Sequence, residues 1–213
     1  MDQKELDKKI SQIAEESEKI MVSCPRAAHH FEHIKRVLKL GLEIGKEEGA
    51  DMAILKPAIL MHDLGRTCED GKTHHSKFSV DVAKKVLEKV DYPKEYWGPI
   101  LYAIENHSWR STAERKEAQI LQDADKLDAI GAIGLARGFA FGGSNNWPEY
   151  NPEDPFLKQD RPMENYTVDH IYWKILRLKR KMHTKKGKEL AEEREKFVRE
   201  FLDRMEKELN GEL

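Results

Sequence analysis

Apolar residues recur along most of the chain at steps of three and four positions, the spacing that places side chains on one face of an α-helix. The alternation of apolar and polar residues that is typical of β-strands is nearly absent. The pattern predicts helices at about residues 4–22, 26–48, 51–63, 74–90, 93–107, 114–140, 167–183 and 186–209. The sequence therefore predicts an all-α protein.

Local signals mark where these helices begin, bend and end. Asp51 is placed to cap the third helix, and Pro57 should bend that helix or lie near its first turns. The glycines from Gly131 to Gly134 predict a break within the sixth helix. Residues 64–73 have the composition of a turn, and residues 141–166 form an irregular stretch rich in Pro, Gly and Asn. For the longer stretch a lid, an oligomer contact and a disordered segment all stay open.

The length of 213 residues is enough for one well-buried core and rather short for two. The chain contains no internal repeat and no Ser- or Gly-rich linker that would divide it. We therefore expect a single domain over residues 1–213, with a core at about 20–185 and a C-terminal helix at 186–209.

The balance of 37 basic and 39 acidic residues gives a formal net charge of −2, which favours neither nucleic acid nor an anionic membrane as a partner. No apolar run approaches the roughly 18 residues of a membrane span, and the first twenty residues lack a signal-peptide core. Cys24 and Cys68 lack a CxxC spacing and should remain thiols. We expect a cytoplasmic protein with no membrane partner and no stable nucleic-acid complex.

Titratable residues interrupt the apolar faces of three predicted helices. They are His33 in the second, the pair His62 and Asp63 at the end of the third, and Asp125 in the sixth. A lone histidine beside an apolar face is most often structural, but an ionisable pair directly after an apolar run must be solvated, paired or bound to a cation. Two imidazoles and two carboxylates brought together by three helices would suit a divalent metal ion.

The order His33, His62-Asp63, Asp125 resembles the H…HD…D signature of HD-domain metal-dependent phosphohydrolases. Similar stretches at 60–66, 106–108 and 123–134 point to the small bacterial single-domain subgroup, and the resemblance covers about residues 20–185. The chain departs from the subgroup pattern Ala-His-Asp-x-x-His at one position, where His30 replaces the aspartate.

The resemblance implies a helical HD-domain bundle that binds one divalent metal ion through His33, His62, Asp63 and Asp125. Mn²⁺, Fe²⁺, Co²⁺, Ni²⁺, Zn²⁺ and Mg²⁺ all remain open as that ion. Because a divalent cation lowers the pKa of water bound to it, such a site can supply a nucleophile for attack on phosphorus. We expect hydrolysis of a phosphate ester in a small phosphorylated substrate, interpreted as a nucleotide, with monoester and diester both open.

Residues near the four ligands receive further roles. We assign Asp63 a second, catalytic role in orienting the attacking water or accepting its proton, and Arg66 the role of neutralising phosphate charge. Lys126, His75 and His107 are assigned to substrate binding, although a structural ion pair would also explain Lys126. The remaining cations considered for phosphate are Lys72 and Arg137.

Three alternative functions stay open. In two-metal relatives the helices that correspond to those of His75 and His107 add ligands, which allows a di-iron HD-type oxygenase. A non-catalytic metal-containing module that binds a nucleotide would use the same residues. A helical scaffold with a vestigial site is the third, and His30 favours it mildly. A homodimer is also left open.

Overall fold

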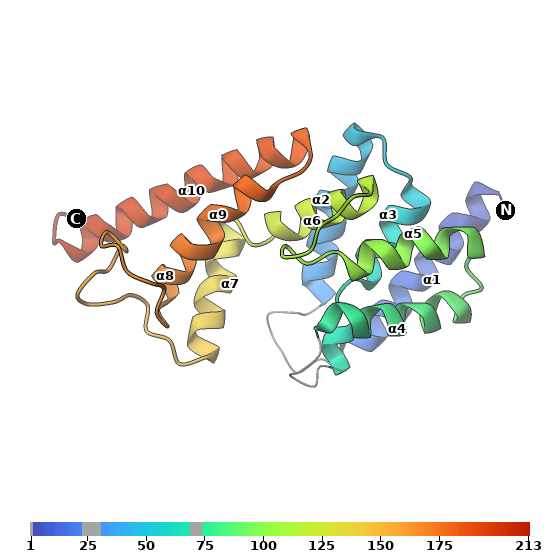
Figure 1. Ribbon diagram of the computed structural model, residues 1–213, viewed down its shortest axis with the longest axis horizontal. Helices are drawn as coiled ribbons and strands as arrows, with labels where there is room; N and C mark the ends of the chain where they lie inside the picture. Colours follow the sequence, from blue (N-terminus) through green and yellow to red (C-terminus); the bar gives the residue numbers. More distant parts are fainter. Residues whose placement is uncertain (1, 23–30, 69–73) are drawn as a thin grey trace. The chain divides into compact units, whose positions relative to one another are not determined.

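The computed structural model of the protein describes residues 2–22, 31–68 and 74–213. Within these ranges the regular structure is helical and contains no strand (Figure 1), so the predicted all-α class is confirmed. The α-helices are α1 (Gln3–Val22), α2 (Phe31–Glu48), α3 (Met52–Met61), α4 (His75–Lys89), α5 (Lys94–Glu105), α6 (Lys116–Leu127), α7 (Gly131–Ser144), α8 (Thr167–His170), α9 (Leu176–Leu178) and α10 (Lys185–Leu209). Short tighter or wider helical turns are η2 (Leu64–Cys68), η3 (Ile171–Ile175) and η4 (Lys179–Lys181).

The predicted signals at the third helix act as expected. The Asp51 side chain accepts a hydrogen bond from the Ala53 backbone nitrogen at 2.8 Å, which caps the first turn of α3. Pro57 lies inside α3, and the helix continues past it to Met61. His62 keeps helical backbone angles and forms the C-cap, and α3 itself ends at Met61, two residues earlier than the pattern predicts.

The break that the glycines predict within the helix at 114–140 is present, because the chain leaves the helical conformation between α6 and α7. Ile130 is extended, with φ −118° and ψ 148°, and Gly131 has φ +85°, which favours glycine. The break therefore lies at residues 128–130 and adjoins Gly131, near the predicted position. The helix predicted at 167–183 is also divided, into α8, η3, α9 and η4.

The described chain divides into two compact units, Met1–Asp125 and Lys126–Leu213. In the first unit α3 is the central helix and packs against α1, α2 and α5. Most of its apolar residues are buried, and Leu55, Ile59 and Met61 have no exposed surface. Burial of each such side chain contributes about 1.5 to 3 kcal/mol, so the end of α3 is held firmly. A single domain over 1–213 stays a prediction.

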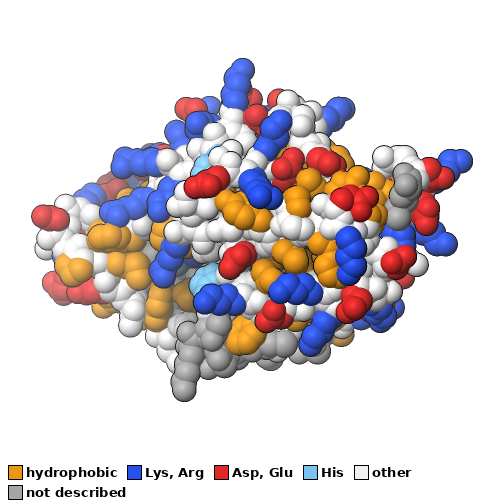
Figure 2. All heavy atoms as spheres, turned by 45° about the vertical axis from the view of Figure 1, so that its right-hand side comes forward, with side chains coloured by type: hydrophobic (Ala, Val, Ile, Leu, Met, Phe, Trp, Pro, Cys, Tyr) orange, Lys and Arg blue, Asp and Glu red, His pale blue; other side chains and the backbone are white. Residues whose placement is uncertain are grey.

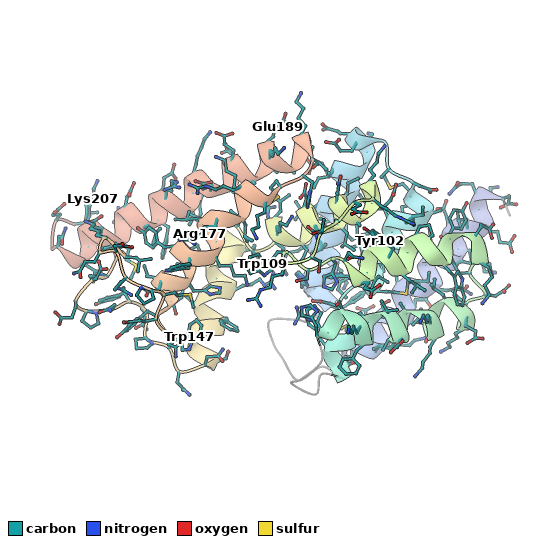
Figure 3. All side chains as sticks on the ribbon, in the orientation of Figure 1. Tyr102, Trp109, Trp147, Arg177, Glu189 and Lys207 are labelled. Carbon is teal, nitrogen blue, oxygen red and sulfur yellow. The ribbon has the colours of Figure 1, made fainter. Side chains whose placement is uncertain are left out.

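In the second unit α7 packs against α10 and α8. Val198 and Leu202 of α10 are buried in this contact, and the ring of Phe201 lies 5.8 Å from that of Phe139. Figure 3 shows Trp147 beside the C-terminal end of α7, where its ring lies 5.3 Å from that of Phe141. These helices pack as ordinary amphipathic elements.

A buried charge network organises the stretch 145–166. The guanidinium of Arg161 donates to the carboxylate of Asp169 at 2.6 and 2.9 Å and to Asp154 at 3.0 Å. Asp169 has no exposed surface. The irregular stretch predicted from its Pro, Gly and Asn content is therefore folded back on the second unit by an arginine that the composition does not reveal.

The surface agrees with the balanced composition. Basic and acidic side chains are intermixed on the face shown in Figure 2, with apolar side chains among them. Among the described residues, no helix has the length and apolar character that crossing a membrane requires.

Candidate metal centre

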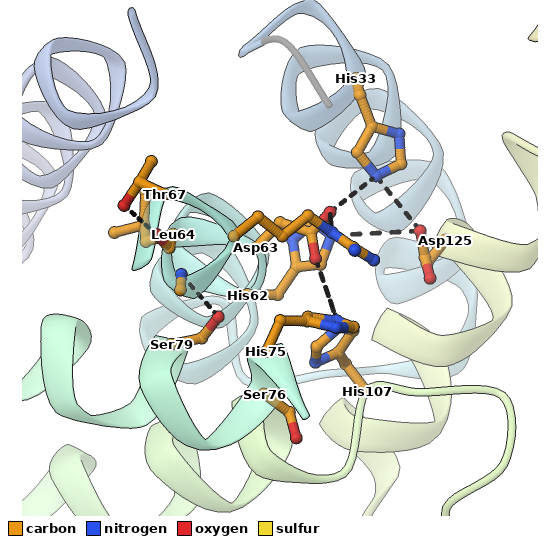
Figure 4. A network of polar contacts seen from close by, with 12 residues as sticks. His33, His62, Asp63, Leu64, Thr67, His75, Ser76, Ser79, His107 and Asp125 are labelled. Atoms are coloured by element: carbon orange, nitrogen blue, oxygen red, sulfur yellow. Dashed lines mark hydrogen bonds and ion pairs between the residues drawn. The ribbon is translucent and has the colours of Figure 1, made fainter. Parts of the chain in front are cut away.

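The four side chains predicted as metal ligands lie together in the first unit (Figure 4). His33 Nε2 is 3.3 Å from Asp125 Oδ1 and 3.7 Å from Asp63 Oδ2. His62 Nε2 is 3.8 Å from Asp63 Oδ2 and 4.0 Å from Asp125 Oδ1. Two nitrogens and two oxygens from three parts of the chain thus surround one point.

The helices fix these side chains. His33 is in the first turn of α2, His62 and Asp63 follow the last turn of the buried α3, and Asp125 is in the last turn of α6. His33, His62 and Asp63 are buried, whereas the Asp125 side chain keeps 29% of its surface exposed. The group is therefore reached by solvent on the side of Asp125.

Two further histidines meet the other oxygen of Asp63. Asp63 Oδ1 is 3.4 Å from His75 Nε2 and 3.5 Å from His107 Nε2, and the two nitrogens are 3.0 Å apart. His75 begins α4 and His107 follows α5. The structure therefore shows two His/Asp groups that could hold a metal ion, and Asp63 is a member of both.

The backbone selects the tautomer of two of these rings. His62 Nδ1 lies 2.7 Å from the carbonyl oxygen of Ile59, and His107 Nδ1 lies 2.6 Å from that of Ile104. A carbonyl oxygen only accepts, so each Nδ1 must carry the proton. In the neutral ring Nε2 then keeps its lone pair, and this nitrogen faces the site in both residues.

Burial keeps the rings of His62 and His75 neutral. Desolvation lowers the pKa of His62 to about 4 and that of His75 to about 2, against the attraction of Asp63. For Asp125, burial raises the pKa, but the hydrogen bond with His33 and the attraction of His33 and His62 together outweigh it, and the pKa falls below its usual value. Near neutral pH the site thus offers the neutral imidazoles of His62 and His75 beside the anionic carboxylate of Asp125, the protonation states that bind a cation.

The donor set fits a divalent cation. Two ligand atoms bound to one ion at about 2.1 Å lie between about 3.0 and about 4.2 Å apart, according to the angle between them. The four distances from His33 Nε2 and His62 Nε2 to the oxygens of Asp63 and Asp125 all fall in that interval. In the described ranges His62 Nε2 is buried and makes no hydrogen bond, which is costly unless a ligand occupies its lone pair.

The cations singled out in the sequence have different surroundings. Arg66 Nε lies 2.8 Å from Asp63 Oδ2, so its guanidinium adjoins the site. Lys126 is buried, and its ammonium donates to the backbone carbonyl of Lys181 at 2.6 Å. Arg137 pairs with the buried Asp128. His30, Lys72 and Cys24 lie outside the described residues.

Sequence reasoning missed two buried polar residues near the site. Ser79 of α4 accepts a hydrogen bond from the Gly65 nitrogen, and Gln122 of α6 bonds the loop that follows α5. Single polar residues within amphipathic helices give no periodic signal. Their positions one turn from His75 and Asp125 were the available clue.

A family model described as HD domain matches residues 30–130, a range that contains all six His and Asp residues of the two groups. The protein YpgQ of Bacillus subtilis (strain 168) is 33% identical over 192 residues, 87% of this chain and 86% of YpgQ. The chain belongs to the HD-domain family.

Solved structures of other HD-domain proteins agree. A crystal structure of Bacillus subtilis YpgQ in complex with ADP has a TM-score of 0.77 and 30% identity, covering 96% of each chain. An HD-superfamily hydrolase from Bacillus thuringiensis has a TM-score of 0.77 and 29% identity, covering 96% of this chain and 98% of that one. This chain thus has the fold of HD-superfamily hydrolases, which supports a metal-dependent hydrolase as its class.

Proposed function

We propose that this HD-domain protein is a phosphohydrolase that cleaves a phosphate ester bond in a nucleotide. One divalent metal ion would be held by His33, His62, Asp63 and Asp125. The observation that carries this proposal is the convergence of these four side chains around the buried Nε2 atom of His62. A cation there would offset the cost of leaving that nitrogen without a partner.

A nucleotide is the proposed substrate because of the relative YpgQ, which has been crystallised in complex with ADP. The surroundings of the candidate site suit the same chemistry. Arg66 places a guanidinium beside Asp63, and a guanidinium has several N–H donors for phosphoryl oxygens. The expected cytoplasmic location and a homodimer remain predictions.

When bound, a divalent cation polarises a phosphoryl oxygen and makes water a better nucleophile near neutral pH. Asp63 is the proposed residue that orients the attacking water or accepts its proton. Because His107 Nδ1 donates to Ile104, its Nε2 can only accept from His75. His75 Nε2 therefore carries the proton of this hydrogen bond, and His75 and His107 are both proposed to bind the substrate.

One observation favours a second candidate, a di-iron HD-type oxygenase. The distances among His75, His107 and Asp63 run from 3.0 to 3.5 Å. Two nitrogens bound at right angles to one ion at about 2.1 Å would lie about 3.0 Å apart. This second group therefore also fits a cation, and two bound irons with oxygen consumption would select the oxygenase over the phosphohydrolase.

The deciding experiment measures phosphate release from a panel of nucleotides and phosphomonoesters, with each of the six divalent metals in turn. We expect release from at least one nucleotide and about one metal ion per chain. The double variant His62→Ala/Asp63→Ala should lose both the bound metal and the activity. His183→Ala, an exposed histidine of the second unit, is the control and should retain both.

Two outcomes would contradict the proposal. Stoichiometric metal in the double variant would refute the assigned ligands. Tight nucleotide binding by the wild type without phosphate release under any metal would select the non-catalytic binding module instead.

A further inference from the structure

The side chain of Gln122 joins α6 to the loop after α5. It is 1% exposed, and its Nε2 lies 2.7 Å from the carbonyl oxygen of Asn106 and 3.0 Å from those of Ser108 and Ser111. One buried amide group therefore contacts three backbone carbonyls within six residues of chain.

These contacts add to the loop's own turn bond, in which the Ser111 nitrogen donates to the Ser108 carbonyl at 2.9 Å. The chain between α5 and α6 is not helical, so its carbonyl oxygens are outside any helical hydrogen-bond ladder. An amide group carries two N–H bonds, and three carbonyls must share them. Loss of the amide would remove a donor from the carbonyls of Asn106 and Ser111, and an acceptor that is buried without a donor is costly.

The position of Gln122 relates this loop to the metal centre. Asn106 and Ser108 are the two neighbours of His107, so the amide holds the backbone on both sides of that histidine. Gln122 precedes Asp125 by three residues in α6 and so lies on the same side of the helix. A single side chain thus connects the segment carrying His107 with the helical turn carrying Asp125.

We propose that Gln122 is a positioning residue. It maintains the relative position of the two His/Asp groups by fixing His107 relative to Asp125. This inference rests on the proposed function, because the relative position of the two groups matters only if the site binds a cation. Gln122 touches neither the cation nor the substrate and acts through the residues that it holds.

The test is a titration of Co²⁺ into the metal-free protein, followed by visible absorption. Gln122→Glu keeps the shape of the side chain but replaces the donor with an oxygen facing three carbonyl oxygens. We expect a dissociation constant for Co²⁺ about 10- to 100-fold higher than in the wild type, the range found when supporting partners of metal ligands are removed. The absorption spectrum should change as well, since ligand geometry changes.

A matched control is present in the same helix. Gln119 lies one turn earlier, and its Nε2 donates to the carbonyl of Ala113 at 3.0 Å in the same loop. Gln119→Glu should alter the Co²⁺ affinity less than about threefold. Affinity is compared only between samples that circular dichroism shows to be folded, so lower global stability alone does not change it.

Wild-type Co²⁺ affinity and spectrum in folded Gln122→Glu would overturn the inference. If that variant does not fold, Gln122→Met, which has neither donor nor charge, takes its place under the same criterion. A wild type that binds Co²⁺ but releases no phosphate would refute the proposed function alone, since the titration does not depend on hydrolysis.

Discussion

The backbone nitrogen of Gly65 donates a hydrogen bond to the Ser79 hydroxyl across 2.9 Å. A Cβ atom on residue 65 would lie closer than 3.0 Å to the Ser79 nitrogen and to the His75 carbonyl oxygen. These are backbone atoms of α4, which cannot give way as a flexible side chain can. The close approach of α4 to η2, and with it the contact of His75 with Asp63, thus depends on a residue without a side chain.

We predict that Gly65→Ala lowers the free energy of unfolding by about 1 to 3 kcal/mol, the cost of overpacking a filled interior. Urea denaturation measures this change. Gly143→Ala is the control, because a Cβ there meets nothing within 4 Å and should be neutral or stabilise α7 by up to about 1 kcal/mol. Equal stability of the two variants would contradict the steric argument.

Arg66 should support catalysis through its contact with Asp63. Arg66→Lys retains the positive charge but loses the planar guanidinium whose Nε lies 2.8 Å from Asp63 Oδ2. We predict a fall of about 10- to 100-fold in kcat/KM for phosphate release. Arg110→Lys, an exposed arginine beside Trp109, should leave kcat/KM unchanged. Full activity of Arg66→Lys would show that the guanidinium of Arg66 is not needed for catalysis.

Arg161 should be the most important charged residue for the stability of the second unit. Arg161→Ala leaves the carboxylates of Asp154 and Asp169 without their guanidinium, and removing the partner of a fully buried carboxylate such as Asp169 is strongly destabilising. Urea denaturation and limited proteolysis within 145–166 measure the effect. Arg177→Ala removes only a contact with the half-exposed Trp173 ring and should cost less than about 1 kcal/mol. Similar losses in both variants would contradict this prediction.

His170 makes stability depend on pH. Burial, and then the charge of Lys174, lower its pKa from 6.5 to about 4 in the folded protein. Between these pH values the unfolded chain binds a proton on His170 that the folded protein does not bind. The stability that the buried neutral ring contributes is therefore fully present above pH 6.5 and is lost as the pH falls to about 4. The slope approaches 1.4 kcal/mol per pH unit, an upper bound for a partly exposed ring.

Urea denaturation of wild type and His170→Gln at pH 7 and pH 5 isolates this contribution. The variant should lose less stability on acidification than the wild type does, because glutamine does not titrate. Identical losses would show that His170 titrates normally in the folded state.

Periodicity and the order of polar residues carried most of the prediction. Local patterns and a resemblance were enough to predict the helical class and a set of metal ligands, namely His33, His62, Asp63 and Asp125. The network of Arg161 and the bonds of Gln122 could not be predicted, because they join residues that no local pattern relates. The glycines predicted the break after α6, but not the extended conformation of Ile130, because its side chain is one that a helix would accept.

The two oxygens of Asp63 face different pairs of histidines. A change at His33 or at His107 therefore alters one pair and leaves the other intact, whereas a change at residue 63 damages both in a single step. For laboratory evolution this means that new chemistry is reached by varying the imidazoles around a fixed aspartate, and that libraries randomised at position 63 will consist almost entirely of inactive clones.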